Sequence, residues 1–150
     1  MNAYMQMAIE EAREGIQEGH GGPFGAVIVK DGEVIAKGHN HVVAYNDPTC
    51  HGEIDAIRKA CKKLGTFDLS GCELYTSGYP CPMCTGAIMW ANIEKVYYGC
   101  NTTDTEIIGF RDKEFEESIP QRVMKWEELD RDECLKLYDE YHNIQNKTMY

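Results

Sequence analysis

Two short motifs, far apart in the sequence, together contain the residue types of a catalytic metal site. The first is H-G-E at 51–53 and the second is P-C-P-M-C at 80–84. One imidazole and two thiolates suit Zn²⁺, and three protein ligands leave its fourth tetrahedral position open for water. The remaining carboxylate, Glu53, is of the type that moves protons to and from such a water. The motifs therefore predict a hydrolytic zinc site with His51, Cys81 and Cys84 as ligands.

The spacing within each motif fits this chemistry. Cys81 and Cys84 are separated by one turn of a helix, so both sulfurs can face one ion. Pro80 and Pro82 favour a helix that starts here, and the positive end of a helix dipole favours thiolates. A second helix is expected to start at His51, so two helix starts would meet at one metal. Glu53 then points elsewhere, toward the water rather than the metal.

Two other interpretations of the cysteine motif are weaker. A C-x-x-C pair also occurs in redox proteins and in structural zinc sites. A redox pair has no need of His51 and Glu53, and a structural site would require a fourth ligand, which Cys50 or Cys100 could provide. The remaining cysteines are expected to be small buried hydrophobes or half-exposed thiols, namely Cys50, Cys61, Cys72, Cys100 and Cys134. Seven cysteines without a signal-peptide pattern do not indicate a secreted disulfide scaffold.

Composition limits the class of protein and of partner. A chain of 150 residues with 43% hydrophobic and 27% charged residues is expected to be one soluble domain, residues 1–150. No apolar run approaches the ~20 residues of a membrane span, and we expect a cytoplasmic protein. The net charge of −10 disfavours nucleic acid and favours a small uncharged substrate. The basic residues at 58–63 are expected to form a solvated helix face.

The hydrophobic pattern predicts the elements that would carry these motifs. We expect a helix over 2–18, a hairpin of strands 24–30 and 33–37 around Asp31-Gly32, and a polar loop over 38–49. A helix over 51–64, with Thr49 capping its start and Gly65 its end, is followed by a strand over 72–77. A helix over 82–91, with Ile88 and Met89 facing inward, and a strand over 95–99 complete the alternation.

The order of these elements predicts an α/β fold, a three-layer α/β/α sandwich with a mixed central sheet. Residues 101–117 are expected to be irregular, and 121–126 to form a last strand. Residues 132–145 are expected to form a C-terminal helix, because their apolar residues recur at helical spacing. Catalytic residues in such a sandwich are expected at the ends of its strands.

At this level of detail the chain resembles the cytidine-deaminase-like superfamily of zinc hydrolases, whose nucleobase deaminases carry H-x-E and P-C-x-x-C motifs. Within it, the chain is most similar to the bacterial guanine deaminases. The segments that show this are 21–32, 46–49, 56–61, 80–84, 86–88 and 109–112. The resemblance implies the same sandwich fold, one zinc ion per subunit, and hydrolysis of guanine to xanthine and ammonia.

The resemblance also implies roles for individual residues. His51, Cys81 and Cys84 would hold zinc, while Glu53 and Asp112 would be catalytic, with Asp112 meeting the exocyclic amine. The substrate would be bound by Asn40, Phe24, Gly52 in the pocket wall, and Tyr150. The family implies a homodimer in which the C-terminal segment, about 132–150, closes over the active site and is exchanged between subunits. His20, His39 and His41 are expected to be surface loop residues rather than ligands.

Two departures from the family pattern leave the substrate open. Tyr79 stands where glutamate is common, and Gly52 where alanine is common. Gly52 and the segment 84–88 are similar to the fungal cytosine deaminases, so cytosine or another nucleobase or nucleoside is an alternative substrate. A tRNA adenosine deaminase is disfavoured by the acidic charge. A zinc-binding module without activity is disfavoured because Glu53 is present.

Overall fold

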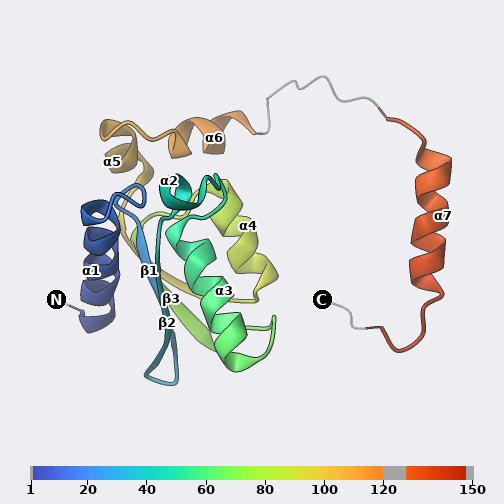
Figure 1. The fold of residues 1–150 in the computed structure, drawn as a ribbon, viewed down its shortest axis with the longest axis horizontal. Coiled ribbons are helices and arrows are strands. Elements are labelled where there is room, and N and C mark those ends of the chain that lie inside the picture. The colour runs from blue at the N-terminus through green and yellow to red at the C-terminus, as the bar shows by residue number, and fades with distance from the viewer. Residues whose placement is uncertain (1, 120–127, 148–150) are drawn as a thin grey trace. The chain divides into compact units, whose positions relative to one another are not determined.

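A four-stranded mixed sheet forms the centre of the first part of the chain in the computed structural model, which describes residues 2–119 and 128–147. The strands β1 (Gly25–Lys30), β2 (Glu33–His39), β3 (Cys72–Gly78) and β4 (Lys95–Cys100) lie in the order β2-β1-β3-β4 (Figure 1). β1 is antiparallel to β2 and β3, whereas β3 and β4 are parallel. Asp31 and Gly32 both have positive φ, 50° and 78°, as the predicted tight hairpin requires.

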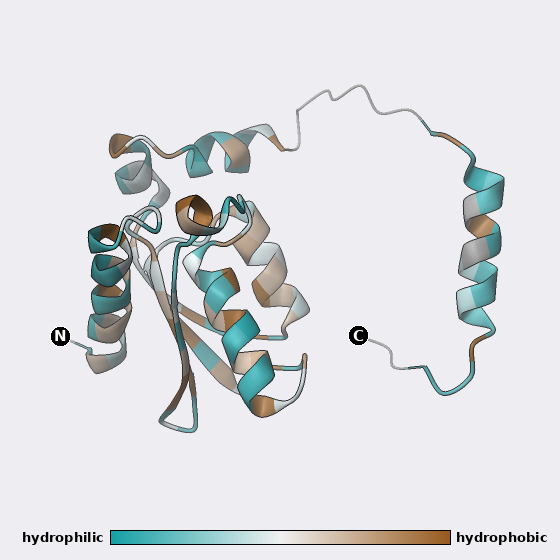
Figure 2. Cartoon of the chain, in the orientation of Figure 1, coloured by the Kyte–Doolittle hydropathy of each residue, from teal (hydrophilic) through white to brown (hydrophobic). Residues whose placement is uncertain are grey.

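Helices cover both faces of this sheet, which confirms the predicted three-layer fold. α1 (Ala3–Gln17) lies on one face, and α3 (Gly52–Leu64) and α4 (Pro82–Trp90) lie on the other (Figure 1). Ala8 of α1 packs with Val27 and Tyr75 in one apolar cluster, while Ile28 packs with the other two helices in a second. Figure 2 shows hydrophilic residues alongside apolar ones on α1 and α3, as expected of amphipathic helices.

Two details of the predicted helices differ from the structure, namely the cap of α3 and the inward face of α4. α3 ends at Gly65, whose φ of 66° is the left-handed conformation expected of a terminal glycine. Thr49 does not cap its start, because its hydroxyl donates to Asp47 at 2.6 Å and His51 occupies the cap position. In α4, Ile88 is buried as predicted, but Met89 is 70% exposed. Adjacent helical residues diverge by about 100°, so both cannot face the core.

Two segments predicted as loops contain helices. The polar segment over 38–49 begins with the end of β2 and contains the short helix α2 (Val42–Tyr45). The segment over 101–117 contains α5 (Thr102–Ile107) and α6 (Asp112–Ser118). Asn101 starts α5 with a capping box. Its side chain accepts from the backbone N–H of Asp104, and the Asp104 carboxylate accepts from the backbone N–H of Asn101, both at 2.9 Å. These reciprocal hydrogen bonds stabilise the start of a helix that is too short to show an apolar periodicity.

The contacts divide the chain into two units, Met1–Ile119 and Pro120–Tyr150. The second contains α7 (Arg131–His142), whose range agrees with the C-terminal helix predicted over 132–145. Figure 2 shows α7 to be mainly hydrophilic. The predicted strand over 121–126 and the predicted substrate residue Tyr150 lie outside the described residues. Within 2–119 and 128–147, every helix is too short or too polar to cross a membrane.

Candidate functional site

The two motifs each begin a helix, as predicted. His51 is the N-cap residue of α3 and Cys81 is the N-cap residue of α4, where Pro82 occupies the first turn. Both caps have extended backbones, with ψ of 163° and 168°, and neither side chain makes the N-cap hydrogen bond of its helix. The imidazole and the thiol are therefore free to turn toward each other across the carboxyl end of β3.

The three predicted ligands have the geometry of a zinc site. Nδ1 of His51 lies 3.5 Å from Sγ of Cys81 and 3.6 Å from Sγ of Cys84. Tetrahedral zinc, with Zn–N of about 2.0–2.1 Å and Zn–S of about 2.3 Å, places nitrogen and sulfur about 3.6 Å apart. In the described part of the chain neither Cys50 nor Cys100 joins this group. The donor set thus fits zinc with an open fourth position, and does not support the structural-site alternative.

The pKa values of the two thiols are shifted in opposite directions. Hydrogen bonds with Cys84 and with His51 lower the pKa of Cys81 to about 4. The Cys81 sulfur and burial raise the pKa of Cys84, while the contact with Cys81 raises the pKa of His51. A divalent cation among these atoms would favour thiolate at both cysteines, since the metal ligand is the deprotonated form.

Glu53 lies beside the three ligands in the first turn of α3. It is only 5% exposed, and burial raises its pKa. Its Oε1 accepts a hydrogen bond from the hydroxyl of Thr76 at 3.1 Å, and its Oε2 accepts from Sγ of Cys84 at 3.4 Å. A buried carboxyl with a raised pKa is suited to take up and return a proton during a reaction.

Thr76 is a part of the site that the sequence motifs do not contain. It comes from β3, is 1% exposed, and its hydroxyl also lies 3.0 Å from the carbonyl oxygen of Gly78. A hydroxyl can donate one hydrogen bond and accept others. Thr76 can therefore donate to ionised Glu53, or donate to Gly78 and accept from protonated Glu53. Its place near the end of the strand before the cysteine motif is the signal that could have found it.

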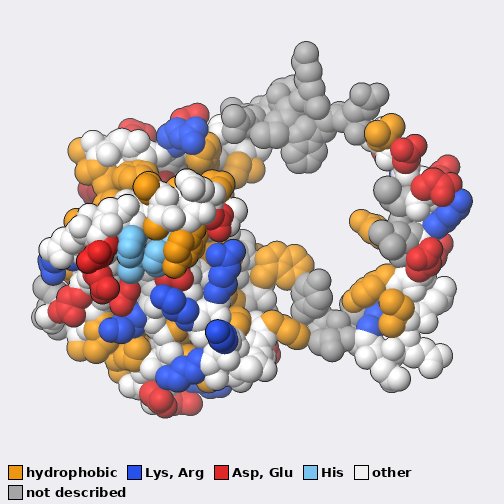
Figure 3. Space-filling view, viewed as in Figure 1, with side chains coloured by type: hydrophobic (Ala, Val, Ile, Leu, Met, Phe, Trp, Pro, Cys, Tyr) orange, Lys and Arg blue, Asp and Glu red, His pale blue; other side chains and the backbone are white. Residues whose placement is uncertain are grey.

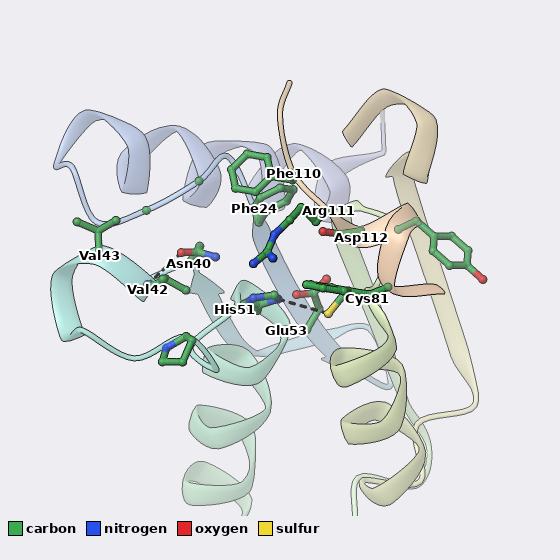
Figure 4. Close-up of a pocket in the computed structure, with 15 residues that line it drawn as sticks. Phe24, Asn40, Val42, Val43, His51, Glu53, Cys81, Phe110, Arg111 and Asp112 are labelled. Atoms are coloured by element: carbon green, nitrogen blue, oxygen red, sulfur yellow. Dashed lines mark hydrogen bonds between the residues drawn. The ribbon is translucent and has the colours of Figure 1, made fainter. Parts of the chain in front are cut away.

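A cavity of about 520 Å³ opens beside these residues and brings most of the predicted site together. Its wall includes Phe24, Asn40 and Asp112 as well as His51, Glu53 and Cys81 (Figure 4). This volume is in the range of small-molecule sites, which is about 300–1,000 Å³. The structure thus places a pocket of ligand size directly against the candidate metal group.

Polar and aromatic groups line the cavity opposite the metal group. The rings of Phe24 and Phe110 meet edge to face, with centroids 4.9 Å apart and planes at 81°. Asn40 is 4% exposed, and its Oδ1 accepts from the backbone N–H of Val42 at 3.0 Å. Figure 4 shows its amide nitrogen turned into the cavity. Asp112, at the start of α6, has its pKa raised by burial.

The structure also gives positions that differ from the predictions. Arg111 was given no role, yet it extends into the cavity, with its guanidinium carbon 4.8 Å from the ring centre of Phe115 (Figure 4). Gly52 was expected in the pocket wall, but it does not line this cavity. A Cβ at Gly52 would lie 2.8 Å from the carbonyl oxygen of Phe24. Glycine at this position instead lets the start of α3 approach the backbone that leads into β1.

His20, His39 and His41 were predicted to be surface loop residues, but the structure places them in buried or half-buried positions. His39 and His41 are each 6% exposed, and His20 is half-buried. β2 continues to His39, so this residue belongs to the sheet rather than to a solvated loop. His41 stacks on Tyr45, with centroids 4.5 Å apart. The high polarity of the segment concealed this packing from the sequence pattern.

Comparison with known proteins relates this fold and site to zinc-dependent deaminases. The model of the cytidine and deoxycytidylate deaminase zinc-binding region matches residues 1–100. The chain is 46% identical to the guanine deaminase of Bacillus subtilis, over 98% of this chain and 97% of that protein. It is 37% identical to a tRNA-specific adenosine deaminase of Aquifex aeolicus, over 92% and 91%. The X-ray structure of the Bacillus subtilis guanine deaminase superposes with a TM-score of 0.92, covering 100% of this chain and 99% of that one.

Proposed function

Because the chain belongs to the cytidine and deoxycytidylate deaminase zinc-binding family, we propose that it hydrolyses guanine to xanthine and ammonia. The protein is a zinc-dependent nucleobase deaminase. The observation that carries the choice of guanine is the likeness to one guanine deaminase over almost the whole of both chains, in sequence and in structure. The cavity beside the candidate metal group supplies the space and the polar groups for a free base.

We assign zinc to His51, Cys81 and Cys84. When bound, zinc lowers the pKa of a coordinated water from about 16 toward 7 and so supplies a nucleophile at neutral pH. Two thiolates balance the charge of the divalent cation, and the positive ends of α3 and α4 further stabilise the thiolates. A neutral metal group of this kind suits an uncharged substrate.

The acidic side chains of the cavity carry out the proton transfers of the reaction. Glu53 accepts the proton released by the attacking water and passes it to a ring nitrogen. It then carries the remaining proton of the new C–OH group to the amine, which leaves as ammonia when the C–N bond breaks and the C=O bond forms. Thr76 can hold Glu53 in both of its protonation states. Asp112 is assigned to the exocyclic amine, where a carboxyl with a raised pKa assists departure of ammonia.

The remaining groups bind the base. The aromatic wall of Phe24 and Phe110 provides a surface for stacking against the purine. The amide nitrogen of Asn40 is a donor facing the cavity, and guanine presents O6 and N7 as acceptors. Because Oδ1 of Asn40 is already held by Val42, the amide has a fixed orientation and selects an acceptor on its ligand.

We further propose a cytoplasmic homodimer in which the segment 132–150, with Tyr150, closes over the active site. The similarity to the guanine deaminase extends over 98% of the chain and so includes most of this segment. Exposed apolar side chains on α4 and β4, among them Met89 at 70% and Tyr98 at 50%, support contact with a second copy. Exchange of the segments between the two subunits is consistent with both observations.

A second candidate is deamination of adenosine in tRNA, which the Aquifex aeolicus relative favours. The net charge of −10 opposes it, since nucleic-acid binding depends on basic side chains that neutralise phosphates. Cytosine is the other alternative, and Tyr79, which lines the cavity, is a residue that could distinguish the bases.

A substrate panel separates these functions. Ammonia release would be measured with guanine, cytosine, adenine, their nucleosides and a tRNA, alongside the zinc content of the same protein. We expect guanine to give the highest kcat/KM, with Glu53→Gln as the inactive control. A higher kcat/KM with another substrate would replace guanine, and activity without zinc would contradict the mechanism.

A further inference from the structure

One basic side chain reaches into the cavity of the proposed active site and takes no part in the proton transfers of the reaction. Among the residues that the structure describes, Arg111 is the single arginine or lysine in the cavity wall. Figure 3 shows lysine and arginine side chains in blue over α3, and none of the basic residues of that helix lines the cavity. Arg111 is therefore the group that gives the binding space a local positive charge.

The backbone of Arg111 is held on both sides. The ring of the preceding Phe110 packs edge to face against Phe24, and a Cβ at Gly22 would lie only 2.7 Å from the Phe110 ring. The carbonyl oxygen of Arg111 accepts from the backbone N–H of Phe115 at 3.0 Å, which is the first hydrogen bond of α6. These contacts fix the point from which the arginine side chain enters the cavity.

The guanidinium of Arg111 is available for a ligand. Its carbon lies 4.8 Å from the centre of the Phe115 ring, a cation–π contact that orders the side chain and needs no particular N–H group. Among the described residues it has no hydrogen-bond or ion-pair partner. Figure 4 shows the guanidinium and the amide of Asn40 turned toward the same part of the cavity. Arginine carries five N–H donors and no acceptor, so a group that it binds by hydrogen bonds must be an acceptor.

Two donors in one part of the cavity match one edge of guanine. When the amine-bearing C2 faces the metal group, the far side of the ring system presents O6 and N7, which are adjacent acceptors. Arginine commonly donates to this same edge where proteins recognise guanine in nucleic acids. A purine with an amine at position 6 instead presents a donor there.

We propose that Arg111 is a specificity-determining residue that donates to O6 of the substrate, beside the Asn40 amide at N7. The inference rests on the proposed deamination of guanine and adds the reason why a 6-oxopurine is preferred. A site that is built to hydrogen-bond one substrate group rejects an analogue without it, because the polar group of the protein then has no partner.

Purines that differ from guanine at a single acceptor test this inference. 2-Aminopurine keeps the C2 amine and N7 but lacks O6, whereas 7-deazaguanine keeps O6 and lacks N7. Ammonia release by the full-length protein gives kcat and KM for each base. Competition against guanine gives the inhibition constant of an analogue that turns over slowly.

Removing the arginine should affect only the bases that carry O6. Arg111→Ala should lower kcat/KM about tenfold for guanine and for 7-deazaguanine, because a hydrogen bond from a charged donor is lost. Its kcat/KM or inhibition constant for 2-aminopurine should equal that of the wild type. The fall should be in KM rather than kcat, since O6 is bound alike in the ground state and the transition state.

Two variants serve as controls. Lys113→Ala removes a basic residue of α6 that does not line the cavity, and kcat/KM should be unchanged for all three bases. Arg111→Lys keeps a charged donor but loses the planar fork of the guanidinium, so it should retain part of the preference for bases with O6. The zinc content and melting temperature of each variant should equal those of the wild type.

The outcomes separate this inference from the proposed function. If the wild type deaminates guanine and Arg111→Ala changes kcat/KM by the same factor for all three bases, or changes none of them, the role of Arg111 at O6 is overturned and the deaminase function stands. An equal rise for all three bases would likewise overturn it, because the side chain would then only obstruct the cavity. A wild type that releases no ammonia from guanine would contradict the proposed function itself.

Discussion

Replacing Glu53 with glutamine should abolish most turnover while the zinc site and the fold remain. The amide oxygen can still accept from Thr76, and the amide N–H can donate to the sulfur of Cys84, so both contacts of the carboxylate keep a partner. Burial is the largest influence on the pKa of Glu53 and raises it, so a neutral amide avoids the cost of burying a charge at this position. We therefore expect the melting temperature and the zinc content of Glu53→Gln to equal those of the wild type.

The expected loss of activity follows from the proton transfers that glutamine cannot perform. Positioned acid–base catalysis contributes about 10²–10⁴-fold, which corresponds to about 2.7–5.4 kcal/mol of transition-state stabilisation. Ammonia release from guanine gives kcat/KM, mass spectrometry gives the zinc content, and calorimetry gives the melting temperature. Glu53→Asp, which keeps the acid but withdraws it by one methylene, should retain intermediate activity. A Glu53→Gln enzyme with more than a tenth of wild-type kcat/KM would refute the assignment.

Three further changes test the ligands, the base contact and the C-terminal segment. Cys84→Ser should lose one equivalent of zinc and lower the melting temperature, because metal binding contributes to folding; unchanged zinc would remove Cys84 from the ligand set. Asn40→Asp keeps an oxygen for the N–H of Val42 but removes the donor, so kcat/KM should fall about tenfold, equivalent to about 1.4 kcal/mol, with the melting temperature unchanged. A lower melting temperature in Asn40→Asp, accompanying the fall in kcat/KM, would instead give Asn40 a purely structural role. Deleting 148–150, including Tyr150, should reduce turnover while zinc content and melting temperature are retained, and an unaltered rate would contradict closure by this segment.

The metal group could be predicted from the sequence because its ligands lie in local motifs. His51, Cys81 and Cys84 need only two helix starts to meet, and the apolar pattern together with Pro80 and Pro82 predicted these starts. Thr76 lies outside these motifs, and its place near the end of a strand is a signal that does not identify its partner. Its contact with Glu53 joins residues from a strand and a helix that are 23 positions apart. That contact depends on the register of β3 against the rest of the sheet, which no local pattern specifies.

The same distinction explains the errors in the fold. The long helices and the hairpin follow from hydrophobic periodicity, which is strong over ten or more residues. α2, α5 and α6 are too short for such a pattern and depend on caps and on contacts with the rest of the fold. The capping box of Asn101 and Asp104 was visible as an N-x-x-D sequence, whereas the burial of His39 and His41 was not. Stacked imidazoles are polar residues that satisfy one another, so hydropathy alone places them in solvent.

The distribution of charge argues that the active site serves a free base rather than a polynucleotide. The cluster of basic residues at 58–63 lies along α3, whereas the cavity is at the start of that helix. With a rise of 1.5 Å per residue, Lys62 is about 16 Å along the axis from His51. Two of the basic residues already face acids, since Arg58 lies 3.9 Å from Asp47 and Lys59 lies 2.9 Å from Asp55. Arg111 extends into the cavity, but the basic residues of α3 lie away from it. A nucleic acid there would have few basic side chains for its phosphates, so turnover of the true substrate should depend only weakly on salt.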